Sequence, residues 1–140
     1  MIIKTTEISV EKSAEDLGAS DITDKVQQAV GESGALEGSA TVFVSGSTAS
    51  ITTMEYDLNL FRDLRAALER ITPSEVYYEH HKTLGDYNGK SHIHAALVGP
   101  SLTVPFSKGN LVLGIWQRIV VMDFDISKKD RRIIVQVMGE

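Results

Sequence analysis

The chain has 140 residues, of which 42% are hydrophobic and 24% charged, and its formal net charge is −5. This length suits one domain with a core of its own, so we expect a single domain over residues 1–140. The acidic balance argues against nucleic acid as a partner, because phosphate backbones are bound by clustered lysine and arginine. The absence of cysteine excludes disulfides and thiolate chemistry and fits a reducing compartment.

No apolar run in the sequence approaches the length that a membrane span requires. The first residues alternate between apolar and polar side chains, which is not the pattern of a signal-peptide core. We therefore expect a cytoplasmic protein with no membrane partner.

The first forty-four residues predict a strand, a helix and a second strand. Residues 2–10 are rich in β-branched side chains and alternate toward their end, which predicts a strand. Residues 11–19 are polar and predict a loop. Apolar residues at helical spacing follow, and Ser20 or Asp21 can cap that helix. The apolar run 40–44 predicts a strand that is buried on both faces.

The segment 45–57 carries six hydroxyl side chains ahead of Glu55. Glycine and small hydroxyl residues can offer backbone and side-chain donors to an anion such as phosphate. A strand–turn–strand with a threonine-rich exposed face is the alternative, and the pattern favours it. The segment is not a P-loop, because the glycine–lysine ending of that motif is missing.

A second helix is predicted from residue 58 to residue 71, where leucine, phenylalanine and isoleucine recur three or four apart. Asp57 or Asn59 can cap its start, and Pro73 ends it. We expect this helix to serve packing and not chemistry.

The second half of the chain predicts mainly strands joined by short turns. They cover residues 95–98, 101–106, 111–113, 118–124 and 131–138. The short basic run Lys128, Lys129, Arg131 and Arg132 is predicted to be a solvated turn. Two helices against a mainly antiparallel sheet or sandwich give an α+β fold.

All four histidines of the chain lie between His80 and His94, and two glycines in this stretch predict a loop. On a strand, His92 and His94 would share one face and could share a metal ion. Asp86 is a candidate ligand, a partner that fixes a histidine tautomer, or a general base. A histidine taken singly is more often structural, and the spacing matches no standard metal motif.

Trp116 is the only tryptophan, and it either walls a ligand pocket or fills the core, with the core favoured. Gln117 beside it begins an apolar strand and would need a hydrogen-bond partner there.

Several motifs spread over nearly the whole chain share a pattern with a known family. They are Gly46-Ser-Thr48-Ala49, Gly85-Asp86-Tyr-Asn88-Gly89-Lys-Ser91-His92, Gly99-Pro100-Ser101 with Pro105, Gly114-Ile-Trp116-Gln117 and a closing Val-Gln-Val-Met-Gly139-Glu140. These motifs resemble the YjbQ family, also called UPF0047 or the secondary thiamine-phosphate synthase family. The Gly-Ser-Thr-Ala version is similar to its archaeal branch.

The resemblance implies a small α+β homotrimer with a polar pocket at or near subunit boundaries. It implies catalytic roles for Glu55, Asp86 and His92, and metal binding by His80, His92 and Glu55. Substrate contacts are implied for Thr48, Asn88, Trp116 and Gln117. The expected cofactor is a divalent metal, Mg²⁺ or Zn²⁺, with no nucleotide cofactor, and the expected ligand is a small phosphorylated molecule. His81 and His94 are expected to be bystanders.

The sequence departs from the family pattern at two positions. Many members carry a histidine, within Pro-His-Thr-Thr-Ala, where this chain has Gly46, so a ligand from that histidine is absent. The usual Leu-Gly-Thr-Trp-Gln has Ile115 in place of threonine, which removes one hydroxyl near the pocket.

The activity implied by the resemblance joins hydroxymethylpyrimidine diphosphate to thiazole phosphate and releases diphosphate. No lysine or arginine clamp for phosphate stands out within the motifs, which predicts a weak or secondary activity. Two alternatives stay open: a non-catalytic protein that binds a divalent metal or a phosphorylated metabolite, and a structural trimer whose histidines bond across subunits.

Overall fold

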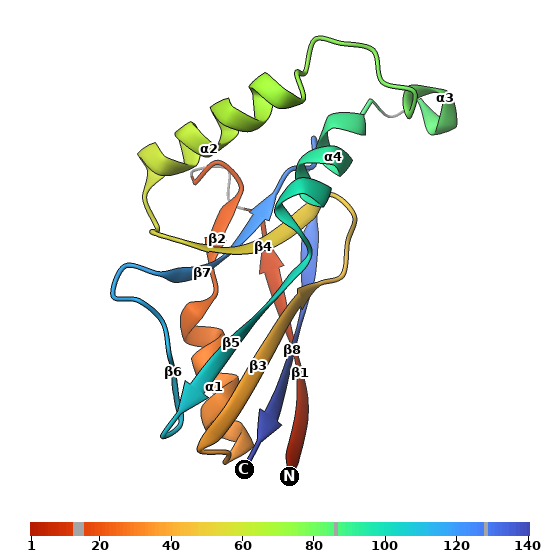
Figure 1. The fold of residues 1–140 in the computed structure, drawn as a ribbon. Helices are drawn as coiled ribbons and strands as arrows, with labels where there is room; N and C mark the ends of the chain where they lie inside the picture. The colour runs from red at the N-terminus through yellow and green to blue at the C-terminus, as the bar shows by residue number, and fades with distance from the viewer. Residues whose placement is uncertain (13–15, 86, 128) are drawn as a thin grey trace.

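A computed structural model describes residues 1–12, 16–85, 87–127 and 129–140 (Figure 1). Its strands are β1 (Ile2–Glu11), β2 (Ala19–Asp21), β3 (Glu37–Val44), β4 (Ala49–Met54), β5 (Ser101–Ser107), β6 (Asn110–Leu111), β7 (Arg118–Asp123) and β8 (Asp130–Gly139). Its helices are α1 (Thr23–Ser33), α2 (Leu58–Ile71), α3 (His81–Leu84) and α4 (Gly89–Val98). The predicted α+β class is confirmed.

Two antiparallel sheets form the framework. The larger has the strand order β1-β8-β3-β5-β6 and the smaller the order β2-β7-β4. In the larger sheet β1 pairs with β8 along its full length, from Ile2 opposite Gly139 to Glu11 opposite Asp130. The two ends of the described chain therefore lie side by side, as Figure 1 shows.

The smaller sheet is covered on both faces, which explains the unbroken apolar run of its middle strand. One apolar cluster lies between the two sheets and α1, and β7 contributes Ile119 and Val121 to it. The other cluster lies on the opposite face, where Val120 and Met122 of β7 pack with Phe61 of α2. Each fully buried side chain of this size stabilises the fold by roughly 1.5–3 kcal/mol. In Figure 1, α2 and α4 lie at the end of the molecule opposite the two termini.

The segment that holds the histidines is helical, and the predicted loop and the predicted strand 95–98 are both wrong. Helix α3 begins at His81, and α4 runs from Gly89 to Val98. The chain turns between them at Gly85, whose φ of 70° is in the left-handed region that glycine favours. We expected two helices, and the described part of the chain contains four.

Three smaller expectations also fail. Strand β2 begins at Ala19, the last residue of the predicted loop 11–19, and includes Ser20 and Asp21, which were predicted to cap the helix. The strand predicted for 111–113 ends at Leu111. Arg131 is not in a solvated turn, because alternation along β8 turns it inward and leaves it 6% exposed. None of the described helices combines the length and apolarity that crossing a membrane requires.

Candidate functional site

The start of α4 is pressed against the chain that precedes α3, and a glycine makes this contact possible. A Cβ on Gly89 would lie 2.9 Å from Cβ of Tyr78 and 3.4 Å from Cβ of His80. This close approach brings His80 beside His92, one turn into α4. The two imidazole rings have centroids 4.7 Å apart and planes at 65°. Two histidines twelve positions apart in the sequence thus become neighbours.

His92 lines an open hollow of about 410 Å³ between α4 and the β3–β4 connection. The other lining residues are small or lack a polar side chain, apart from one serine. They are Gly46, Ser47, Ala49, Ala95, Ala96 and Pro100. Because these residues project little into the hollow, a ligand could lie against their backbone and reach His92.

Buried polar atoms accompany His92 on the same helix. Ser91 is fully buried and Asn88 is 8% exposed. The hydroxyl oxygen of Ser91 and the amide oxygen of Asn88 have no hydrogen-bond partner among the described residues. An unsatisfied buried polar group costs about 1–3 kcal/mol. Neither residue is among those that line the hollow. The motif quoted above contains Ser91, but the sequence did not single it out.

The remaining two histidines contact other parts of the chain. His94 is buried, with Nε2 3.2 Å from the carbonyl oxygen of Thr72, and its ring meets Phe124 edge-on. Burial lowers the pKa of His94, and the Thr72 carbonyl offsets part of that effect. His81 packs its ring against Tyr87 at 4.6 Å. Since successive helical residues are rotated by about 100°, His92 and His94 do not share a face, contrary to the strand prediction.

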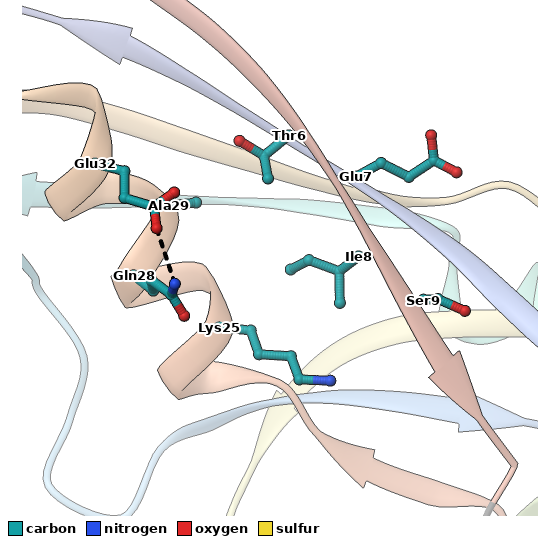
Figure 2. A pocket seen from close by; sticks show the side chains of 8 residues that line it. All are labelled: Thr6, Glu7, Ile8, Ser9, Lys25, Gln28, Ala29 and Glu32. Atoms are coloured by element: carbon teal, nitrogen blue, oxygen red, sulfur yellow. Dashed lines mark hydrogen bonds between the residues drawn. The ribbon is translucent and has the colours of Figure 1, made fainter.

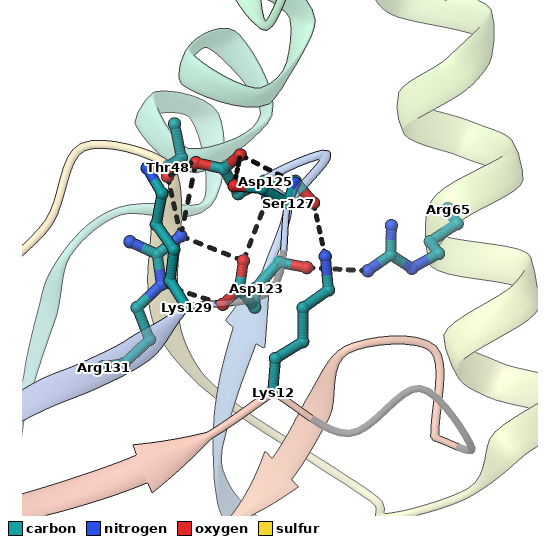
Figure 3. Close-up of polar contacts among 8 residues, drawn as sticks. All are labelled: Lys12, Thr48, Arg65, Asp123, Asp125, Ser127, Lys129 and Arg131. Carbon is teal, nitrogen blue, oxygen red and sulfur yellow. Dashed lines mark hydrogen bonds and ion pairs between the residues drawn. The ribbon is translucent and has the colours of Figure 1, made fainter.

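Thr48 lies beneath the hollow in a buried polar network, which Figure 3 shows. Its hydroxyl donates to Asp125 over 2.8 Å and accepts from Nη2 of Arg131 over 2.7 Å. Arg131 also makes a two-pronged contact with Asp123, at 2.8 Å from Nε and 2.9 Å from Nη2. Thr48 is 3% exposed and its one proton is already donated. Its role in substrate binding stays a prediction.

Hydrogen bonds favour the charged forms of two members of this network, Asp125 and Arg131. Burial by itself would raise the pKa of Asp125, but donors on Ser127 and Thr48 and the ammonium of Lys129 outweigh it and hold that pKa far below its usual range. The hydrogen bonds to Asp123 raise the pKa of Arg131 against its own burial. Both pKa shifts favour the charged forms of Asp125 and Arg131 near neutral pH.

Three other predicted site residues lie at the opposite end of β4. Glu55 follows the strand directly and is exposed. Gln117 bonds its amide oxygen to the backbone of Gly114 and its amide nitrogen to Thr53, on the same strand. Trp116 is 70% exposed and does not fill the core. At a rise of about 3.3 Å per residue, Glu55 is about 20 Å along the strand from the hollow.

The described residues do not assemble a complete metal site. In residues 1–12, 16–85, 87–127 and 129–140, no three histidine, aspartate or glutamate side chains gather closely enough to hold an ion. His80 and His92 supply two adjacent imidazoles, whereas Glu55 lies beyond their reach in the same chain. Asp86 lies outside the described residues. The metal expected from the sequence therefore stays a prediction.

Another hollow, of about 280 Å³, lies between β1 and α1 (Figure 2). Two of its polar side chains are hydrogen-bonded to each other, since Gln28 donates to Glu32 over 2.8 Å. It contains none of the residues that the sequence singled out, and we do not regard it as the functional site.

The fold and the hollow together define a small antiparallel α+β protein with two histidines beside an open cavity. Residues 6–140 match the model of the family described as "UPF0047 protein YjbQ-like". A UPF0047 protein of Archaeoglobus fulgidus is 32% identical over 127 residues, which cover 91% of this chain and 96% of that one. The UPF0047 protein YugU of Bacillus subtilis is 30% identical and covers 99% of this chain, over its own full length.

Solved structures agree with this match. A YbjQ-like protein of unknown function from Sulfolobus solfataricus superposes with a TM-score of 0.89 at 31% identity, covering 99% of this chain and 98% of its own. A yjbq/upf0047 protein from Clostridium acetobutylicum gives a TM-score of 0.85 at 36% identity, covering 95% and 99%. The chain belongs to the UPF0047 (YjbQ-like) family.

Proposed function

We propose that the hollow beside His92 binds a small phosphorylated molecule and supports a secondary thiamine-phosphate synthase activity. The observation that carries this proposal is the position of His92, on the wall of the hollow with the ring of His80 4.7 Å from its own. A cavity lined mainly by apolar residues, with a few polar groups that point into it, is the usual form of a metabolite site.

In the proposed reaction a thiazole nitrogen attacks the methylene carbon of hydroxymethylpyrimidine diphosphate. A carbon–nitrogen bond forms, the carbon–oxygen bond breaks, and diphosphate leaves with the electron pair. His92 donates a hydrogen bond or proton to the departing oxygen, and His80 orients it. The amide of Asn88, one helical turn before His92, bonds to the edge of the pyrimidine. A divalent cation, when bound, would neutralise charge on the diphosphate.

The test is product formation by the purified protein from both precursors and Mg²⁺, followed as thiamine phosphate. We expect His92→Ala to abolish the product and His81→Ala to retain it, because His81 packs among tyrosines away from the hollow. Failure to detect product with the unmodified protein, or equal output from His92→Ala, would remove the enzymatic claim.

The adjacency of two imidazoles favours one alternative, a non-catalytic protein that binds a divalent metal. This proposal predicts stoichiometric Zn²⁺ in elemental analysis after equilibration with the ion. The content should fall when either His80 or His92 is replaced by alanine, and should hold in the His81→Ala control. Metal content below one-tenth equivalent in the unmodified protein would exclude it.

We further propose that the chain assembles as a homotrimer and that the site is shared between subunits. The support is that, within one chain, Glu55 lies about 20 Å along β4 from the hollow that His92 lines, and Gln117 bonds to Thr53 at the Glu55 end of that strand. Ile115 and Trp116 are 89% and 70% exposed on the same loop. Side chains of this kind exposed together are typical of a protein contact. A head-to-tail contact that closes a ring would bring this loop to a neighbour's hollow.

Mixing two inactive variants tests the shared site. His92→Ala and Trp116→Ala damage different ends of the same subunit, so a mixed trimer contains some sites with both residues intact. Co-refolded mixtures should regain product formation that neither variant shows alone. Mixtures as inactive as their components, or a monomeric mass in solution, would refute the arrangement.

A further inference from the structure

Four basic side chains from three separate parts of the chain meet beneath the β3–β4 connection. Lys12 donates to the carbonyl of Asp125, and Arg65 donates to the carbonyl of Asp123 over 3.0 Å. Lys129 lies 3.0 Å from the Asp125 carboxylate, and Arg131 grips Asp123. Lys129 and Arg131 contact the two carboxylates, whereas Lys12 and Arg65 bind main-chain carbonyl oxygens, so the group drawn in Figure 3 contains two more cationic than anionic side chains.

One nitrogen of Arg131 is not used inside this group. Nε and Nη2 make all the hydrogen bonds of the guanidinium to described residues, which leaves the two N–H groups of Nη1 without an acceptor among them. In Figure 3 one guanidinium nitrogen of Arg131 points away from both carboxylates. Nη1 lies 2.8 Å from the point where a Cβ on Gly46 would stand. Only the missing side chain of Gly46 gives Nη1 this space.

The connection itself offers further donors. Among the hydrogen bonds of the described residues, the backbone N–H groups of Gly46, Ser47 and Thr48 have no acceptor. Gly46 and Ser47 line the His92 hollow, and the Ser47 side chain is exposed. Successive unpaired N–H groups above a cation form the kind of concavity that binds phosphate oxygens.

We propose that the Gly46–Thr48 connection and Nη1 of Arg131 form the phosphate-binding part of the His92 hollow. This inference rests on the proposed function, since it places the phosphate or diphosphate group of the ligand in that hollow. Phosphate fits better than a cation, because the available groups are N–H and O–H donors over a net positive charge. It fits better than a neutral ligand, because three backbone donors and a guanidinium match an oxyanion with several acceptors.

Isothermal titration with inorganic phosphate and, separately, inorganic diphosphate tests the subsite at low ionic strength. Both ions should bind the unmodified protein, with diphosphate tighter if two phosphate groups fit the hollow. Gly46→Ala places a Cβ against Nη1 and should weaken both by about tenfold. Gly31→Ala is the matched control, since a Cβ there meets nothing within 4 Å, and its affinity should equal that of the unmodified protein.

A second pair of variants tests the subsite without altering the Gly46–Thr48 connection itself. Lys129→Met removes one of the four cations from a half-exposed position and should weaken phosphate binding about threefold. Lys82→Met removes a lysine of similar exposure that pairs with Glu79, and should leave the affinity unchanged. Far-UV circular dichroism and the melting temperature establish that each variant is folded.

The proposal is overturned if the unmodified protein binds neither ion, or if a folded Gly46→Ala variant binds both as tightly. It is also overturned if Lys129→Met and Lys82→Met lose affinity equally. Phosphate binding that responds to Gly46→Ala without any thiamine phosphate product would refute the enzymatic function alone. Product formation unaffected by Gly46→Ala would refute the subsite alone.

Discussion

Replacing Arg131 by methionine should lower the free energy of unfolding more than the same change at Arg132, the other arginine of β8. The side chains of Arg131 and Asp123 are 6% and 2% exposed, and the change removes two hydrogen bonds to Asp123 and one to Thr48. Asp123 then keeps one described donor, the backbone N–H of Asp125. Removing one partner of a buried ion pair costs about 3–5 kcal/mol, against a total stability of about 5–15 kcal/mol.

Urea unfolding followed by far-UV circular dichroism measures this loss. Trp116 is too exposed to report on the core by fluorescence. Protein concentration must be held fixed, because assembly would shift the midpoint. Arg132→Met is the control: the neighbouring arginine pairs with Glu7 at 2.7 Å, but both side chains are more than half exposed. That change should cost less than about 1 kcal/mol. If both variants lose equally little, the buried network does not stabilise the fold as argued.

Three further outcomes are expected. Asp57→Ala should lower the unfolding free energy by about 1 kcal/mol, because that carboxylate caps α2, while Asn59→Ala should change it little; equal losses in urea would contradict this assignment. Gly89→Ala should drive the start of α4 away from Tyr78 and alter the imidazole proton signals of the His80–His92 pair by NMR, and an unchanged spectrum would contradict the close packing. Because burial lowers the pKa of His94, the unfolded chain takes up that proton first; its contribution is complete above the ordinary value of 6.5 and is lost as pH falls below it. The unmodified protein should therefore lose stability between pH 7 and 5 more steeply than His94→Phe, and equal slopes in urea midpoints would refute that reasoning.

The sequence predicted best where one periodicity was strong. The apolar spacing of α2 predicted both its ends, Leu58 and Ile71, and Asp57, one of the two cap candidates, caps it in the structure. The alternation of the first and last strands gave β1 and β8 within one or two residues. Helix α4 was missed because His92-Ile-His94 alternates like a strand, while the glycines on either side suggested turns. The residues that recur at helical spacing in α4, Asn88, His92 and Ala96, are polar or small, so they form no apolar stripe that would indicate a helix.

The candidate site was less accessible to prediction, because tertiary contacts create it. The sequence singled out His80 and His92, and the fold does bring their rings together. The same reasoning placed Arg131 in solvent, because a run of basic residues looks solvated and the inward face of β8 is visible only once its partners are known. No local pattern could show that Gly46 and Arg131, eighty-five positions apart in the sequence, would meet.

The order of strands in the larger sheet also bears on how the chain reaches its fold. Strand β8 is the last of the described strands in the sequence, yet it lies between β1 and β3. Until residues 130–139 are present, β1 has no neighbour in that sheet and β3 has an open edge. Two of the longest ladders must therefore form by closing loops of roughly ninety and one hundred and twenty residues, a topology that folds slowly. Until β8 is synthesised, β1 and one edge of β3 stay unpaired, and a chain without β8 would leave both open to pairing with other molecules.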